Sequence, residues 1–163
     1  MKNISLIISV FLLSFFDAVG QTDSFDVFTF QAPKFFTKSA LPSRVQFNLT
    51  NSDTSFCNIT VYKSQVANSG GSEMTRQWNE HIVKKLTKAD KKPQQVLAGK
   101  QWDGWAHTLA IGNFYQNKKK CVVMLNSFTK DKVAACVVFV MSDKSFKEPV
   151  ESFSKQLHLN NNK

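Results

Sequence analysis

The sequence contains little glycine or proline and few cysteines. Its 163 residues include 6 Gly, 4 Pro and 3 Cys. This composition excludes a collagen-like chain, and hydrophobic residues at 42% with charged residues at 20% are typical of a globular protein rather than a disordered one. The length fits one domain and excludes a large multidomain enzyme.

The cysteines are Cys57, Cys121 and Cys136, and none has the spacing to a second Cys or a His that a zinc site needs. An odd number leaves at least one thiol unpaired in an exported chain. Each lies in an apolar, strand-like run, so we expect three buried free thiols. One disulfide that joins Cys57 to Cys121 or Cys136 is the alternative.

A disulfide between the other two cysteines is excluded by a predicted hairpin. If residues 121–128 and 133–141 pair, we expect Cys136 to face Leu125. Cys121 then lies four residues further along its strand, a separation of about 13 Å, which is too long for a disulfide.

Catalytic motifs are also missing. The sequence has no GxSxG, no HExxH and no glycine-rich phosphate loop. His81, His107 and His158 lack metal-ligand spacing, and His107 alone has a strand setting that could bring it to a cysteine. We therefore expect no catalytic residue, no cofactor and no metal site. A secreted enzyme that uses a Cys/His pair is kept as the alternative.

Only one long apolar run is present, and it lies at the N-terminus. Lys2 precedes the apolar segment Ile4–Phe16, and small residues follow at Ala18 and Gly20. This pattern predicts a secretory signal peptide over residues 1–20, and the segment is too short to cross a bilayer comfortably. We expect a periplasmic or extracellular chain without a transmembrane segment. Removal of the predicted signal peptide takes away one Lys and one Asp, so the net charge stays at +9.

Alternating apolar and polar residues predict an antiparallel sheet. The expected strands are 25–30, 45–50, 56–63, 94–102, 105–111, 121–128 and 133–141. Residues 34–43 are expected to form a loop, and Asp103-Gly104 predicts a two-residue hairpin turn. The near-continuous apolar runs of the last two strands predict the centre of the sheet, covered on both faces.

Two helices are predicted from apolar stripes. The first follows a Ser72 N-cap, and the second has Ser145 as its expected cap and Pro149 in its first turn. Their stripes are Met74, Trp78, Ile82 and Leu86 in the first helix, and Phe146, Val150, Phe153 and Leu157 in the second. Residues 160–163 are expected to be a disordered tail.

The order β-β-β-α-β-β-β-β-α predicts a single α+β domain over residues 21–159. It would be an antiparallel sheet of about six or seven strands with a C-terminal meander, and helices would pack on the sheet.

This order resembles the PsbP-like α/β/α sandwich of photosystem-associated extrinsic proteins and many bacterial envelope proteins. A closer resemblance is to exported proteins of Bacteroidetes-type bacteria that have no assigned activity. The matching segments are 30–34, 56–64, 77–80, 103–105 and the paired strands 121–141. The resemblance implies a fold and an export route, and it implies no catalytic residues.

Positive charge is concentrated in two parts of the chain, which has 21 Lys+Arg against 12 Asp+Glu. The concentrated lysines are Lys84, Lys85, Lys88, Lys91, Lys92, Lys118, Lys119 and Lys120. They predict contact with an anionic surface, or alternatively a solvated face that keeps the protein soluble. Nucleic acid is disfavoured as a partner, because its binding patches usually mix in Arg and aromatic residues, and Arg76 is the one Arg in this region.

These observations predict an exported, non-enzymatic domain that binds a protein, lipid or glycan partner in the cell envelope or outside the cell. A sheet edge, or the cleft between a helix and the sheet, would form the binding surface. The alternatives are the Cys/His enzyme and a basic module for anionic surfaces.

Overall fold

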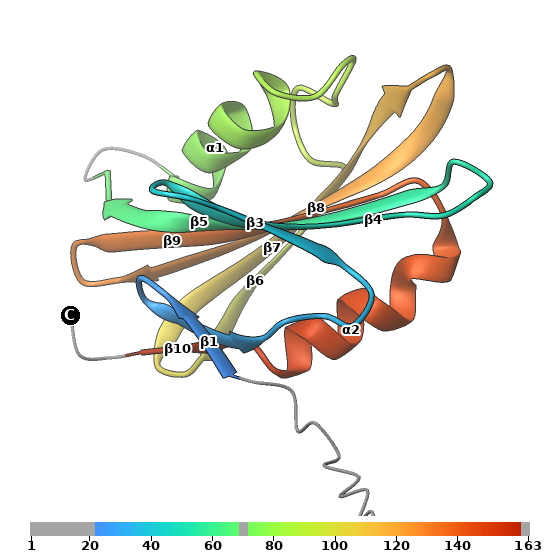
Figure 1. Ribbon diagram of the computed structural model, residues 1–163. Helices are drawn as coiled ribbons and strands as arrows, with labels where there is room; N and C mark the ends of the chain where they lie inside the picture. The colour runs from blue at the N-terminus through green and yellow to red at the C-terminus, as the bar shows by residue number, and fades with distance from the viewer. Residues whose placement is uncertain (1–21, 69–71, 161–163) are drawn as a thin grey trace, which may run out of the picture.

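The computed structural model describes residues 22–68 and 72–160 (Figure 1). The predicted signal peptide lies outside these residues. Seven strands form one antiparallel sheet in the order β3-β4-β5-β9-β8-β7-β6. They are β3 (Thr37–Leu41), β4 (Arg44–Thr50), β5 (Phe56–Val66), β6 (Gln95–Trp102), β7 (Trp105–Gln116), β8 (Lys119–Lys130) and β9 (Val133–Met141). The α+β class and the C-terminal meander are confirmed.

A second, three-stranded sheet has the order β1-β2-β10. Its strands are β1 (Thr22–Phe25), β2 (Phe28–Gln31) and β10 (His158–Leu159). The single strand predicted over residues 25–30 is therefore wrong, because the chain turns at Asp26, which has a φ of 55°. The Asp26 carboxylate accepts a hydrogen bond of 2.6 Å from the backbone N–H of Ser64, which ties this turn to the end of β5.

Two strands lie where the sequence predicts none: one in the predicted loop 34–43 and one at the end of the second predicted helix. β3 lies within the predicted loop 34–43, and all five of its residues are exposed, so it has no apolar alternation to reveal it. β10 comes just before the predicted tail, and the backbone N–H of the next residue, Asn160, donates a hydrogen bond of 2.8 Å to Val27 O. Asn160 is thus tied to the turn between β1 and β2, whereas residues 161–163 lie outside the described chain.

β9 occupies the centre of the large sheet, between β5 and β8. Residues 134–140 are all buried, as expected of a strand covered on both faces. The β8–β9 register places Cys136 opposite Ser127, not opposite Leu125 as predicted. The difference arises because β8 continues to Lys130 before the turn.

The first helix begins at the predicted residue, but its second half differs from the predicted α-helix. Ser72 Oγ accepts a hydrogen bond from Thr75 N–H at 3.4 Å and caps α1 (Glu73–Trp78). The predicted α-helix continues only as a π-helical turn, η1 (Asn79–Val83). Apolar residues four apart fit either helix type, so the sequence pattern could not distinguish them.

The second helix, α2 (Lys147–Lys155), follows a 3₁₀ turn, η2 (Lys144–Phe146). Asp143 caps η2, because its carboxylate accepts a hydrogen bond of 2.9 Å from Ser145 N–H, and Phe146 stands at the N-cap of α2 without a side-chain bond, so the predicted Ser145 cap is wrong. The capping group is therefore the carboxylate of Asp143 and not the hydroxyl of Ser145, which lies two residues later. The predicted apolar stripe is confirmed, since all four of its residues are buried.

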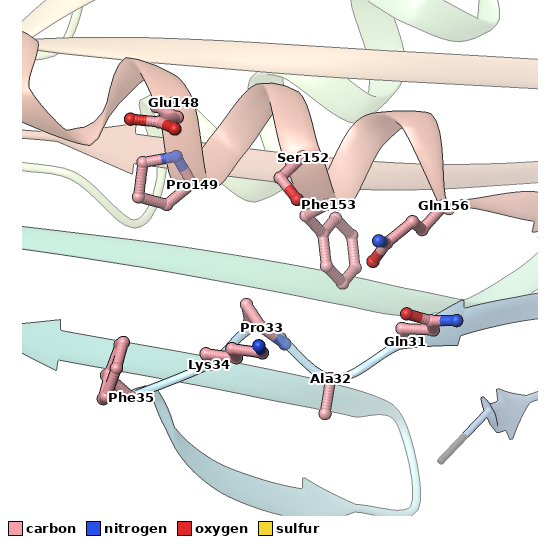
Figure 2. Close-up of a pocket in the computed structure, with 10 residues that line it drawn as sticks. All are labelled: Gln31, Ala32, Pro33, Lys34, Phe35, Glu148, Pro149, Ser152, Phe153 and Gln156. Atoms are coloured by element: carbon pink, nitrogen blue, oxygen red, sulfur yellow. The ribbon is translucent and has the colours of Figure 1, made fainter. Parts of the chain in front are cut away.

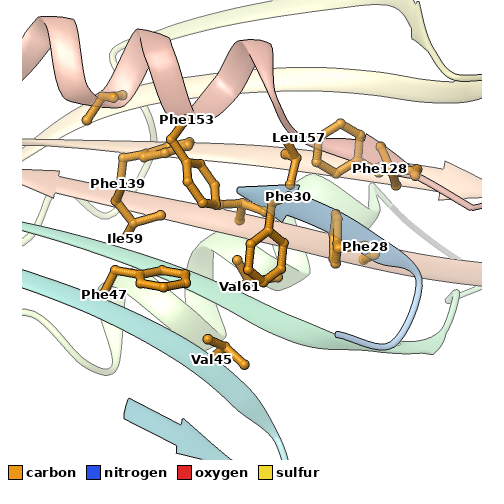
Figure 3. Packing of buried hydrophobic residues seen from close by; sticks show 14 of the residues in the cluster. Phe28, Phe30, Val45, Phe47, Ile59, Val61, Phe128, Phe139, Phe153 and Leu157 are labelled. Atoms are coloured by element: carbon orange, nitrogen blue, oxygen red, sulfur yellow. The ribbon is translucent and has the colours of Figure 1, made fainter. Parts of the chain in front are cut away.

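The two helices cover opposite faces of the large sheet (Figure 1). On the α2 face, the helix and the small sheet enclose a cluster of phenylalanines (Figure 3). The ring centroid of Phe153 lies 5.6 Å from that of Phe30 and 5.8 Å from that of Phe47. On the α1 face, Trp78 and Ile82 pack on β7, β8 and β9.

Candidate functional site

All three cysteines are free and buried, as expected, and neither alternative disulfide forms. Cys57 belongs to the α2-face cluster, whereas Cys121 and Cys136 belong to the α1-face cluster. Burial raises the pKa of the Cys57 thiol to about 12 and also raises those of the other two. These thiols are therefore protonated at neutral pH, and a protonated thiol is a poor nucleophile.

Two of the histidines, His107 and His158, have partners within the fold. His107 stacks on Phe128 at 4.9 Å, on the α2 face, and its Nε2 shares a hydrogen bond of 2.8 Å with Asn126 Oδ1. His158 Nδ1 lies 3.4 Å from the carboxylate of Asp103. Among residues 22–68 and 72–160, no three His, Cys, Asp or Glu side chains gather in a way that could hold a metal ion.

The fold joins the two lysine groups. The segment that follows η1 runs along the edge of β7, where Thr87 O accepts a hydrogen bond of 3.1 Å from Tyr115 N–H and Asn113 O accepts one of 2.9 Å from Asp90 N–H. Tyr115 lies opposite Lys120 at the start of β8. We call the resulting surface the lysine edge, and its exposed members are Lys84, Lys85, Lys88, Lys91, Lys92, Lys118, Lys119 and Lys120.

The acidic groups near the lysine edge have structural partners. Asp90 Oδ2 accepts hydrogen bonds from Asn113 N–H at 2.7 Å and from Gln94 Nε2 at 2.9 Å. Hydrogen bonds from Ser55 lower the pKa of Asp53, and the charge of Lys119 lowers it further. Lys119 is therefore partly neutralised by an acidic neighbour.

A second basic feature lies between the end of η1 and strands β4 and β5. It is a cavity of about 530 Å³, which we call the basic cleft. It is lined by Ser43, Arg44, Tyr62, Lys63, Ser64, Gln65, Glu80, His81, Lys84 and Lys85. Its one carboxylate, that of Glu80, accepts a hydrogen bond of 2.9 Å from Arg76 Nη1. The cleft thus combines four cationic side chains with one carboxylate that already has a cationic partner.

Two aromatic rings form part of the cleft lining. Tyr62 and His81 stack with ring centroids 3.8 Å apart and an interplanar angle of 24°. The pKa of His81 is lowered to about 4, chiefly by burial and also by the positive charges of Arg76 and Lys85, against the opposing charge of Glu80. Burial raises the pKa of Tyr62. At neutral pH the cleft therefore contains a neutral imidazole and a phenol that retains its O–H.

The sequence predicted Lys84 and Lys85 as contacts for an anionic surface, but it did not single out Arg44, Lys63 or Tyr62, which line the same cleft. Arg44 and Lys63 are single basic residues of separate strands, with no local cluster to mark them. The only sequence signal was the alternation along the strand. Val45 faces the phenylalanine cluster, so its neighbour Arg44 points to the opposite face of the sheet.

A third concave feature lies between α2 and the segment that follows β2 (Figure 2). This apolar groove has a volume of about 470 Å³, and Pro33, Phe35, Pro149 and Phe153 contribute its apolar lining. Phe35 is 89% exposed and has a φ of 68°. A positive φ is costly for a bulky residue. The groove thus combines an exposed aromatic ring with local backbone strain.

No model of a known protein family matches the chain, and no curated protein matches it. Solved structures do. LpqN, described as involved in cell envelope biogenesis of Mycobacterium tuberculosis, matches with a TM-score of 0.55 at 9% identity, over 89% of this chain and 87% of LpqN. CyanoP, the cyanobacterial PsbP of Synechocystis sp. PCC 6803, matches with a TM-score of 0.55 at 10% identity, over 85% of this chain and 91% of CyanoP.

A structure from Bacteroides thetaiotaomicron VPI-5482 matches with a TM-score of 0.52 at 13% identity, over 88% of this chain and 49% of that one. Identities this low show a shared fold alone. Membership of the exported Bacteroidetes-type proteins stays a prediction, as does the signal peptide. No helix in the described part of the chain is long and apolar enough to cross a bilayer. The chain therefore has a PsbP/LpqN-like α+β fold.

Proposed function

We propose that this chain is an exported, non-enzymatic domain that attaches to an anionic surface of the cell envelope through the lysine edge. The observation that carries the proposal is the hydrogen bond between Tyr115 N–H and Thr87 O, which brings together two lysine groups that are separate in the sequence. The fold shared with LpqN supports a role in the envelope.

The expected attachment is weak and sensitive to salt. Each basic residue close to an anionic membrane contributes about 1 kcal/mol, and the attraction decays within a Debye length of about 10 Å at 0.1 M salt. Several lysines acting together then give reversible binding without an inserted helix. Lysine suits this role, since its charge lies at the end of a flexible stem and needs no fixed geometry.

Sedimentation with vesicles tests the proposal. Residues 21–163 should bind phosphatidylglycerol vesicles at about 0.05 M salt and dissociate at about 0.5 M, where screening shortens the reach of the charges. They should not bind phosphatidylcholine vesicles. Binding that is equal at both salt concentrations, or no binding to either vesicle, would reject the proposal.

A matched pair of triple variants locates the surface. The change Lys118→Glu/Lys119→Glu/Lys120→Glu should abolish vesicle binding. The control Lys34→Glu/Lys132→Glu/Lys155→Glu makes the same change in net charge at exposed positions away from the lysine edge, and it should retain most of the binding. Equal losses from the two variants would show that net charge matters and that the lysine edge does not.

The non-enzymatic part of the proposal rests on the buried thiols. We expect iodoacetamide to label Cys57, Cys121 and Cys136 only after denaturation, because all three are inaccessible in the fold. Rapid labelling of one thiol in the native protein would contradict this part of the proposal and favour a secreted enzyme that uses a Cys/His pair.

A further inference from the structure

We propose that the basic cleft binds a phosphorylated saccharide, with Arg44 and Tyr62 holding the phosphate group. This site is distinct from the lysine edge, although Lys84 and Lys85 border both. Vesicle attachment by the lysine edge requires a surface, whereas the cleft is a cavity of about 530 Å³, within the usual size range of small-molecule sites.

The β4–β5 register creates the phosphate position. Arg44 and Tyr62 are directly opposite one another in the pairing of β4 with β5. Directly opposed residues project from the same face of a sheet with their Cβ atoms about 5 Å apart. A guanidinium group offers a planar fork of donors that matches two oxygens of a phosphate, and the Tyr62 hydroxyl adds a neutral donor beside it.

The remaining charges of the cleft favour an anion. Lys63 comes from β5, and Lys84 and Lys85 come from the end of η1. The carboxylate of Glu80 is bonded to Arg76 at 2.9 Å, so it leaves an excess of positive charge in the cleft. A concave site lined by one sign of charge raises the local concentration of ligands of the opposite sign.

The rest of the lining indicates the body of the ligand. The cleft is larger than a phosphate needs, and Ser43, Ser64 and Gln65 supply hydroxyl and amide groups that can exchange hydrogen bonds with sugar hydroxyls. An acyl chain in the same space would cover the Ser43 and Ser64 hydroxyls without offering them hydrogen-bond partners, whereas the Gln65 side-chain oxygen already accepts a hydrogen bond of 2.8 Å from Arg76 Nη1. A polyhydroxylated body with an anionic substituent therefore fits the lining better than a lipid tail.

Titration calorimetry on residues 21–163 tests the ligand class with the 6-phosphates of glucose, mannose and galactose, the free sugars and inorganic phosphate. At least one hexose phosphate should bind about tenfold or more tightly than inorganic phosphate, and the free sugars should bind far more weakly. The bound hexose phosphate should shift the NMR signals of the Tyr62 and His81 rings. The proposal is overturned if no hexose phosphate exceeds inorganic phosphate, or if a free sugar binds as tightly as its phosphate.

Variants separate this site from the lysine edge. Arg44→Gln should weaken hexose phosphate binding about tenfold or more, Arg44→Lys should restore part of it, and Tyr62→Phe should weaken it severalfold while the stack with His81 remains. Arg44→Gln should leave vesicle binding intact, and the triple variant at residues 118–120 should leave the cleft intact. Hexose phosphate binding unaffected by Arg44→Gln would overturn the assignment, whatever the vesicle result.

Discussion

The two faces of the seven-stranded sheet are built from the same strands but are covered differently. On the α2 face, Val45 and Phe47 of β4 join a continuous apolar cluster under the helix and the small sheet. On the α1 face, the neighbouring Arg44 of β4 lines the basic cleft instead. The α1 cluster covers mainly β7, β8 and β9. The α2 face thus holds the larger buried cluster, and the α1 face leaves part of the sheet uncovered beside the basic cleft.

The largest effect is expected on the α2 face. Phe153→Ala removes a fully buried ring that lies within 6.0 Å of the rings of Phe30, Phe47 and Phe139. Loss of such a ring should lower the free energy of unfolding by about 3–5 kcal/mol, measured by urea denaturation. Lys155→Ala, at an exposed position of the same helix, should change it by less than about 0.5 kcal/mol. Comparable losses in the two variants would contradict the assignment of the main core to this face.

A smaller effect is expected where α1 meets the sheet. A Cβ at Gly112 would lie 2.8 Å from Cη2 of Trp78. The ring cannot easily move, because Trp78 is buried and its Nε1 donates a hydrogen bond of 2.9 Å to Asp90 O. Gly112→Ala should therefore cost about 1–3 kcal/mol of unfolding free energy.

The same contact provides its own control. Trp78→Phe removes the Trp ring atoms that the new methyl group would meet, so Gly112→Ala should cost much less in that background. Additive losses in the double variant, measured by the same denaturation, would show that the close approach to Trp78 is not the cause.

The smallest effect concerns pH and the basic cleft. The pKa of His81 is lowered to about 4 in the fold, chiefly by burial, whereas an unfolded histidine has one near 6.5. The unfolded chain then binds more protons below pH 6.5, so this stabilising contribution is present above pH 6.5 and lost as the pH falls towards 4. Partial exposure reduces the effect to about 1 kcal/mol between pH 6.5 and 5. His81→Phe retains a ring on Tyr62 and should flatten the change, whereas an unchanged pH slope would count against burial of His81.

Local pattern was enough for much of the fold. Period-2 alternation located β4 and the meander, and Asp103-Gly104 marked a hairpin in which both residues have positive φ. β3 was missed because an exposed edge strand lacks apolar alternation, and its pairing with β4 holds it in place. β10 was missed because two residues are too short for any pattern, and it forms only where β2 offers a partner.

For the candidate sites, too, some features follow from the sequence and others only from the tertiary structure. The sequence by itself determined the excess of lysine, the members of the lysine edge and the burial of the three thiols, because these follow from composition and from neighbours along the chain. The tertiary structure alone decided that the two lysine groups adjoin and that Arg44 stands beside Tyr62. Both depend on which strands pair and in what register. Burial of the phenylalanine face fixes that register, because a slip of one residue would turn Phe47 to the polar side and Arg44 into the core.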